Sequence, residues 1–214
     1  MHPDVEMNRL TKYMRKLQWK NPETLARYYI NKSYAKWNHN VRGMVLEIGG
    51  GRNERYTENS ITLDISNNFN PDILASGYNL PFKDNVFDTI VAIEVLEHLE
   101  SPHAFVNEIH RVLKPTGAFF LTTRFIHEIH GEIDYFRYTK LSLETLFKNF
   151  RIVNVEEQGS ILSVLSHLIV SSFRSSLLYS ILSLFYPLIE KIDEKIDQHR
   201  RKTITLGYSI YGEK

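Results

Sequence analysis

The 214-residue chain contains no cysteine. Disulfide frameworks, thiolate catalysis, cysteine-ligated zinc and iron–sulfur clusters are therefore excluded. The N-terminus, MHPDVEMNRL, has no apolar signal region, so we expect a protein that is not secreted. Low-complexity tracts and internal repeats are also missing, and the 43% apolar and 24% charged residues are typical of a globular protein.

Net charge is almost absent as well, at +1, which argues against a dedicated nucleic-acid binder. The charge is unevenly distributed, because residues 1–42 hold nine Lys or Arg and three Asp or Glu. This segment carries +6 and the remainder of the chain carries −5. A basic N-terminal segment could meet an anionic substrate or membrane, and the alternative is a solvated helix face.

Short apolar runs separated by helical patterns fill the middle of the chain. Such runs indicate strands that are buried on both faces, as in a parallel sheet. We predict strands at residues 44–48, 61–65, 72–75, 87–93, 117–122, 152–156 and 204–211. The last of these alternates between apolar and polar residues, so we expect it to be antiparallel and partly exposed.

Helices are predicted before, between and after these strands. Residues 1–40 have apolar side chains at helical spacing, and the Asn-Pro pair at 21–22 is a helix start signal. The Ser-Pro pair at 101–102 predicts the start of a second helix, with serine as the N-cap. Residues 143–150 repeat apolar side chains at helical spacing and predict a third.

Residues 160–189 contain eighteen apolar or aromatic residues and one permanent charge, Arg174. A membrane span needs about 20 mostly apolar residues, and Arg174 divides this stretch into pieces of about 15. We interpret it as a pair of core or dimer-interface helices. The alternative is a hairpin that lies in a membrane surface or lines a lipid-binding groove. Residues 187–199 continue it as an amphipathic helix.

The strongest motif is VLEIGGG at residues 45–51, followed by an acid, Asp64, at the end of the next strand. Glycines let the backbone approach a ligand closely, and a carboxylate at Asp64 can accept hydrogen bonds from two ribose hydroxyls. A dinucleotide site would need a third glycine where this chain has Glu54, whose charge would repel a pyrophosphate. Glu47, inside the first strand, also favours a cationic ligand over a phosphate.

VLEIGGG resembles the E/D-x-G-x-G motif of class I S-adenosylmethionine-dependent methyltransferases. Residues 80–99 (LPFKDNVFDTIVAIEVLEHL) and 108–123 (EIHRVLKPTGAFFLTT) resemble two further blocks of one large branch of these enzymes. The resemblance implies a Rossmann-like α/β fold with a seven-stranded, mostly parallel sheet and an antiparallel last strand. The helical patterns outside these motifs add an N-terminal helical cap and a helical insertion before the last strand. We place the cap at 1–40, the methyltransferase domain at 41–158 and 200–214, and the insertion at 159–199.

The resemblance implies that four residues surround the methionine part of S-adenosylmethionine. Glu47 would contact the ammonium end of the methionine moiety, directly or through water. Gly49 and Gly51 would line the methionine and the ribose. Glu94, which follows the fourth strand, would lie near the sulfonium.

Four more residues are implied to bind the adenosine part. Asp64 would accept hydrogen bonds from the ribose hydroxyls, with Ile65 packed on the adenine. Asn79 and Leu80 would flank the adenine ring.

A narrower resemblance covers residues 123–139, which contain TRF, HG and DYFRYT. It is similar to the segment after strand five in a subgroup often associated with bacterial surface-polysaccharide and envelope-glycan pathways. His130 is our first candidate for a general base, because the pKa of histidine lies near neutrality. Asp134 could orient His130 or act itself, and Arg137 could bind an anionic substrate group. The alternative is that Asp134, Arg137 and Tyr138 form a structural, hydrogen-bonded lid.

Together these features predict transfer of a methyl group from S-adenosylmethionine to a small or lipid-linked acceptor, with a sugar or glycan hydroxyl as the leading choice. A hydrophobic small molecule such as a quinone is the first alternative, and a non-catalytic cofactor-binding or interaction module is the second. We expect no metal site, because His127 and His130 lack a clear set of carboxylate ligands. We also expect a cytoplasmic protein without a nucleic-acid partner. For residues 160–196 two kinds of contact stay as alternatives, namely a homodimer interface and a peripheral contact with the inner membrane face.

Overall fold

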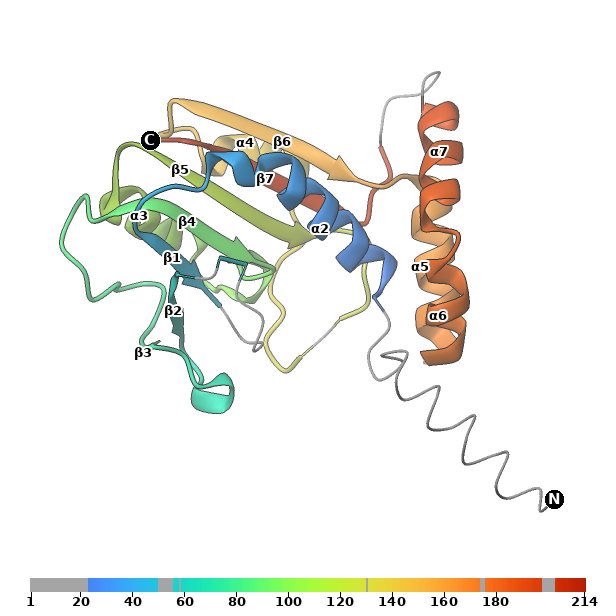
Figure 1. Cartoon of the computed structure of the whole chain (residues 1–214), viewed down its shortest axis with the longest axis horizontal. Coiled ribbons are helices and arrows are strands. Elements are labelled where there is room, and N and C mark those ends of the chain that lie inside the picture. The colour runs from blue at the N-terminus through green and yellow to red at the C-terminus, as the bar shows by residue number, and fades with distance from the viewer. Residues whose placement is uncertain (1–22, 50–55, 58, 130, 174–175, 198–202) are drawn as a thin grey trace, which may run out of the picture.

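The computed structural model of the chain describes residues 23–49, 56–57, 59–129, 131–173, 176–197 and 203–214. Its seven-stranded sheet has the order β3-β2-β1-β4-β5-β7-β6 (Figure 1). The strands are β1 (Val45–Ile48), β2 (Ile61–Asp64), β3 (Ile73–Leu74), β4 (Phe87–Ile93), β5 (Leu113–Arg124), β6 (Ile152–Gln158) and β7 (Gly207–Glu213). The pairs from β3 to β5 are parallel, and β7 runs antiparallel to both of its neighbours. The predicted mostly parallel sheet with an antiparallel last strand is therefore confirmed.

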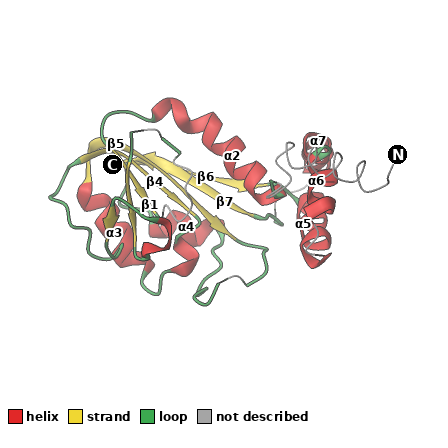
Figure 2. Ribbon diagram, turned by 60° about the horizontal axis from the view of Figure 1, so that its bottom comes forward, coloured by secondary structure: helices red, strands yellow, loops and turns green. Residues whose placement is uncertain are grey.

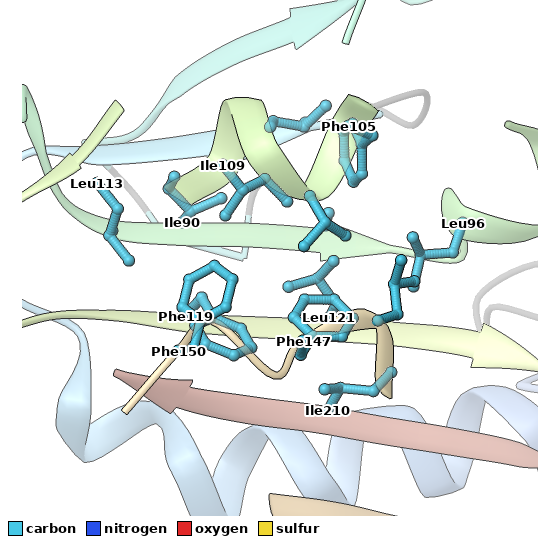
Figure 3. Packing of buried hydrophobic residues seen from close by; sticks show 14 of the residues in the cluster. Ile90, Leu96, Phe105, Ile109, Leu113, Phe119, Leu121, Phe147, Phe150 and Ile210 are labelled. Carbon is cyan, nitrogen blue, oxygen red and sulfur yellow. The ribbon is translucent and has the colours of Figure 1, made fainter. Parts of the chain in front are cut away.

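Helices cover both faces of the sheet, as Figure 2 shows, with α2 (Leu25–Trp37) on one face and α3 (Pro102–Val112) and α4 (Lys140–Leu146) on the other. On the α3 and α4 face, Phe119 of β5 packs against Phe147 and Phe150, with ring centroids 5.4 and 4.6 Å apart (Figure 3). On the α2 face, Phe120 packs against Trp37. Burial of both faces of β5 explains why its sequence is a continuous apolar run rather than an alternating one.

Several element boundaries differ from the sequence-based expectation. The helix α2 begins at Leu25, and its N-cap is Thr24, whose side chain accepts a hydrogen bond from the Arg27 N–H at 3.2 Å. The predicted start at residues 21–22 lies outside the described residues, as does most of the predicted cap at 1–40. Ser101 occupies the N-cap position of α3, but its side chain makes no capping hydrogen bond. The strand β7 begins at Gly207 rather than at residue 204. It is buried along most of its length rather than partly exposed, because it lies between β5 and β6.

The segment between β6 and β7 forms α5 (Ile161–Phe173), α6 (Ser176–Ser183) and α7 (Tyr186–Asp197). Figures 1 and 2 both show these helices side by side beyond one end of the sheet. Within the described ranges, no helix combines the length and the apolar character needed to cross a bilayer.

A buried carboxylate joins the two ends of this helical segment. Asp193 of α7 accepts hydrogen bonds from the Ser160, Leu162 and Ser163 N–H groups at 3.2, 2.9 and 2.9 Å. The Ser163 hydroxyl donates to the same carboxylate at 2.5 Å. These donors lie at the start of α5, where the backbone N–H groups have no partner within the helix and the helix dipole favours a negative charge.

We expect Asp193→Ala to destabilise the protein, because it leaves buried donors at the start of α5 without an acceptor. The free energy of unfolding should fall by about 2–4 kcal/mol, measured by urea denaturation. The control is Glu194→Ala on the exposed side of α7, which should change stability by less than about 0.5 kcal/mol. Equal effects of the two substitutions would contradict this role of Asp193.

Candidate functional site

The carboxyl ends of the parallel strands meet at one edge of the sheet. Gly49, Asp64, Glu94 and Arg124 stand at the ends of β1, β2, β4 and β5, and these four parallel strands are consecutive in the sheet, in the order β2-β1-β4-β5. In α/β sheets, ligands bind outside the carboxyl ends of the strands. This edge is therefore the candidate functional site.

Gly49 makes the turn after β1 possible. Its φ is +73°, and its N–H donates to the Leu63 carbonyl at 2.8 Å. A Cβ atom at this position would lie 2.3 Å from Cγ2 of Val95, which follows β4. Only glycine combines this backbone conformation with such a close approach. The other glycine predicted to line the ligand, Gly51, lies outside the described residues.

Glu47 is buried inside β1, and its carboxylate holds the chain that leads into β2. It accepts hydrogen bonds from the Tyr56 N–H at 3.1 Å, the Thr57 N–H at 2.8 Å and the Ser60 hydroxyl at 2.7 Å. A carboxylate can accept about four hydrogen bonds, so most of its capacity serves this loop. The contact of Glu47 with a methionine ammonium group stays a prediction.

The residues predicted to bind adenosine differ in their surroundings. Asp64 is half-buried, and its Oδ1 accepts a hydrogen bond from the Ser66 N–H at 2.8 Å. Ile65 is 76% exposed although it is apolar, which suits a side chain that packs on a ligand ring. Asn79 is exposed, whereas the Leu80 side chain belongs to the main core. The part that Asn79 and Leu80 play in adenine binding stays a prediction.

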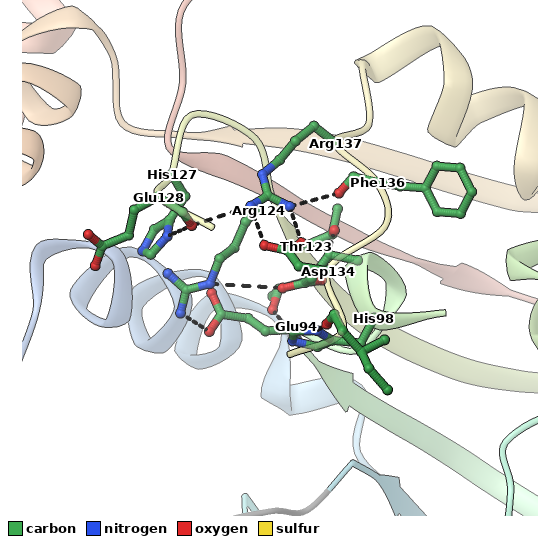
Figure 4. A network of polar contacts seen from close by, with 12 residues as sticks. Glu94, His98, Thr123, Arg124, His127, Glu128, Asp134, Phe136 and Arg137 are labelled. Atoms are coloured by element: carbon green, nitrogen blue, oxygen red, sulfur yellow. Dashed lines mark hydrogen bonds and ion pairs between the residues drawn. The ribbon is translucent and has the colours of Figure 1, made fainter. Parts of the chain in front are cut away.

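A network of charges joins the ends of β4 and β5 (Figure 4). The Arg124 guanidinium donates to Oε2 of Glu94 at 2.5 Å, and its Nε lies 3.9 Å from Oε1 of Glu97. The Thr123 hydroxyl donates to Oε2 of Glu97 at 3.0 Å. Glu94 has a φ of +55°, a strained conformation for a residue other than glycine.

Glu97 is fully buried, at 0% exposure, in the short helix η3 (Leu96–His98). Burial, together with the neighbouring charge of Glu94, raises the pKa of the Glu97 carboxyl to about 7. A carboxyl group with such a pKa changes its protonation near neutral pH. Perturbed groups of this kind gather at functional sites.

The segment after β5 is fixed by a second ion pair. Arg137 donates two hydrogen bonds to Asp134, one of them at 2.7 Å, and the Asp134 side chain is 2% exposed. The Tyr135 N–H donates to the Glu97 carbonyl at 2.8 Å, and the Tyr138 hydroxyl donates to the Leu96 carbonyl at 3.1 Å. These contacts are those of a hydrogen-bonded lid. Catalytic roles for Asp134 and Arg137 stay predictions, and His130 lies outside the described residues.

A cavity of about 440 Å³ opens beside this segment. Its lining combines apolar side chains with one ion pair and one imidazole. The lining residues are Phe125, Ile126, His127, Ile129, Asp134, Tyr135, Phe136 and Arg137. The cavity is wide open to solvent, and its volume lies within the range of small-molecule sites.

Sequence reasoning did not single out Glu97 and Arg124, although both lie inside segments that it quoted. Each lies at or just beyond the end of a predicted strand, and the two strands, β4 and β5, pair in parallel. Opposite charges at the ends of neighbouring parallel strands are the signal that could have found them.

Residues 48–121 match the model of a family described as "Methyltransferase domain". An uncharacterized protein of Methanocaldococcus jannaschii is 41% identical over 85 residues, which is 35% of this chain and 37% of the relative. The mitochondrial ubiquinone biosynthesis O-methyltransferase of Dictyostelium discoideum is 35% identical over 46 residues, 22% of this chain and 14% of the relative. The chain thus spans less than half the length of these curated relatives.

Solved structures share the fold over most of the chain. A SAM-dependent methyltransferase from Archaeoglobus fulgidus superposes with a TM-score of 0.58 and 17% identity, covering 88% of this chain and 94% of that one. The phosphoethanolamine N-methyltransferase 2 of Haemonchus contortus, in complex with S-adenosyl-L-methionine, has a TM-score of 0.56 and 16% identity. The superposition covers 86% of this chain and 52% of the Haemonchus contortus chain. The solved structures show that the chain shares this fold, and the domain match covers residues 48–121.

The buried Glu97 predicts a pH-dependent stability. Its pKa of about 7 lies above the value of an unfolded chain, so between about pH 4.5 and 7 the folded state holds a proton that the unfolded state releases. The stability contributed by this proton is present at low pH and is lost as the pH rises through 7. Glu97→Gln has no ionisable group at this position, so it does not lose this stability. The free energy of unfolding of the variant minus that of the wild type should therefore rise by about 2 kcal/mol from pH 5 to pH 8.

Urea denaturation at several pH values measures this difference. Glu144→Gln is the control, because it makes the same substitution at an exposed position of α4. A Glu97→Gln difference that stays constant across the same range would show that Glu97 ionises as it does in an unfolded chain.

Proposed function

We propose that this chain transfers a methyl group from S-adenosylmethionine to a hydroxyl of a small or lipid-linked acceptor, with a sugar or glycan as the leading class. The observation that carries the proposal is the juxtaposition of two sites at one sheet edge. The Gly49 turn, Asp64 and Ile65 supply groups suited to a nucleoside, and the 440 Å³ cavity beside Arg124 offers room for an acceptor.

The residues at this edge fit the proposed cofactor. The half-buried Asp64 carboxylate can accept hydrogen bonds from vicinal hydroxyls, and the exposed Ile65 can cover an adenine ring. Gly49 leaves room for close approach, and the charges of Glu94 and Glu47 favour a cationic ligand. When bound, S-adenosylmethionine supplies a methyl group on positively charged sulfur.

Positioning is the main task left to the chain's own residues. Methyl transfer needs a nucleophile in line with the methyl carbon, so a fixed acceptor supplies much of the rate. The Asp134–Arg137 ion pair and the contacts of residues 135–138 with η3 hold one wall of the cavity in place. His130 on this segment is the candidate base from the sequence, and we propose that Arg137 lies near anionic groups of the acceptor.

Exposed apolar side chains support a lipid-linked acceptor. Ile129 and Phe136 stand at the cavity and are exposed, and α5, α6 and α7 also expose large apolar side chains. Those on the helices are Leu165, Ile169, Phe173, Leu177, Leu178, Ile181, Leu188, Ile192 and Ile196, and the turn between α6 and α7 adds Leu184 and Phe185. Large exposed apolar surfaces mark sites of interaction, so this face suits a lipid chain or a peripheral contact with a membrane.

Calorimetric titration with S-adenosylmethionine tests the cofactor site. Asp64→Ala should weaken the affinity by about 10- to 100-fold, because charge-assisted hydrogen bonds to the ribose are lost. Asp84→Ala is the control, since it removes an exposed carboxylate ahead of β4, at the opposite edge of the sheet. Absence of binding to the wild type would refute the proposed function, and an unchanged affinity in Asp64→Ala would refute the placement of the ribose.

A radiolabelled methyl-transfer screen tests the acceptor. Free glycans, lipid-linked glycans and quinones form its three arms, and we expect label in a glycan arm, with lipid-linked acceptors preferred. Label confined to quinones would favour a hydrophobic small-molecule acceptor. Binding of the cofactor without transfer in any arm would favour a non-catalytic module. Unchanged turnover in His130→Ala would remove His130 as a base.

A further inference from the structure

The polar atoms left without partners in this structure gather near one place. In the described part of the chain, four buried side-chain atoms lack a hydrogen-bond partner: Oε1 of Glu97, Nε of Arg124 and both ring nitrogens of His167. Buried polar groups in native proteins are nearly always hydrogen-bonded, so each exception needs an explanation such as a ligand. Glu97 and Arg124 belong to the candidate site, whereas His167 comes from α5, in the apolar helical segment.

Contacts of His167 place it beside the acceptor cavity. Its ring centroid lies 4.8 Å from that of His127, with the two planes tilted by 40°. His127 lines the 440 Å³ cavity. His167 itself is 3% exposed and does not line the cavity, so it lies behind His127.

The charged groups that act on His167 come from the candidate site and the segment that follows β5. Burial lowers the pKa of the His167 imidazole, and Arg124 of β5 lowers it further, while Glu128 and Glu94 act in the opposite direction. Tyr179 of α6 lies in the field of the same Arg124 and Glu128. A lowered pKa leaves the imidazole neutral near pH 7, with one ring nitrogen able to accept a proton.

A purely structural role accounts poorly for this residue. An imidazole buried without partners is less favourable than an apolar side chain of similar size. The buried neighbours of His167 in α5 are Val164, Val170, Ser163 and Ser171, and the two serine hydroxyls donate to other acceptors. Leucine or valine would therefore serve packing better at this position.

We infer that His167, rather than His130, is the general base of the acceptor side and receives the proton of the acceptor hydroxyl during methyl transfer; this rests on the proposed methyl transfer. The acceptor oxygen forms a bond to the methyl carbon while the carbon–sulfur bond breaks and its electron pair stays on sulfur. The hydroxyl proton passes to a ring nitrogen of His167, which later releases it to solvent. His127 lines the cavity and contacts His167, which does not line it, so contact of His167 with the acceptor requires the His127 ring to move.

The first test needs no acceptor and uses the pKa of His167, measured by NMR of the histidine ring nitrogens in the full-length protein. The pKa should be lower by at least about 0.3 pH units with S-adenosylmethionine than with S-adenosylhomocysteine, because only the former places a positive sulfur near the ring. His39, which precedes β1 at the opposite edge of the sheet, is the control and should not respond. Equal His167 pKa values in the two complexes would overturn the inference. Failure of both molecules to bind would instead refute the proposed function.

The second test separates chemistry from packing. His167→Leu should keep or raise the melting temperature and leave the affinity for S-adenosylmethionine within about twofold, since it removes only an unpaired buried polar group. Methyl transfer to the acceptor identified by the screen should fall by about 100-fold or more. Full transfer by this stable variant would show that His167 takes no proton. A fall in transfer matched by an equal loss of stability would assign His167 to packing and overturn the inference.

Discussion

The parallel pairing of β4 with β5 is the constraint on which the candidate site depends. It sets Ile93 beside Thr122, so the residues that follow each strand emerge together at one edge. Glu94 and Glu97 then face Arg124, and one arginine lies between two carboxylates in a largely buried setting. Buried charges of this kind are costly unless they are paired, so the fold supplies the pairing through its strand register.

The remaining parts of the site are attached to this edge. Backbone carbonyls of η3 accept hydrogen bonds from Tyr135 and Tyr138, so the segment that lines the cavity is tied to the end of β4. The Asp134–Arg137 pair stiffens that segment. On its other side, α5 carries His167 to His127, and Asp193 of α7 holds the start of α5. The helical segment between β6 and β7 therefore packs behind the cavity wall, and it also forms part of the outer surface.

Local signals made much of the fold predictable. The change from an apolar strand to glycine marks the turn at Gly49, and the alternation in the last strand marks β7 as antiparallel. Helix boundaries were less predictable, because Thr24 competes with Asn21 as an N-cap and both have suitable side chains. The charge network was missed because Glu97 and Arg124 are distant in sequence and meet only through strand pairing. His167 was also missed, because a single histidine in an apolar stretch gives no signal before its spatial neighbours are known.

The central claim is that the cofactor binds at the carboxyl edge of β1, β2 and β4, with its sulfur directed toward the cavity after β5. A crystal structure of the full chain with S-adenosylhomocysteine tests it most directly. The account predicts ribose hydroxyls within hydrogen-bond distance of Asp64, the adenine on Ile65 and the sulfur on the Glu94 side, facing the cavity lined by His127. A ligand bound at the opposite edge of the sheet, or with its ribose away from Asp64, would contradict it.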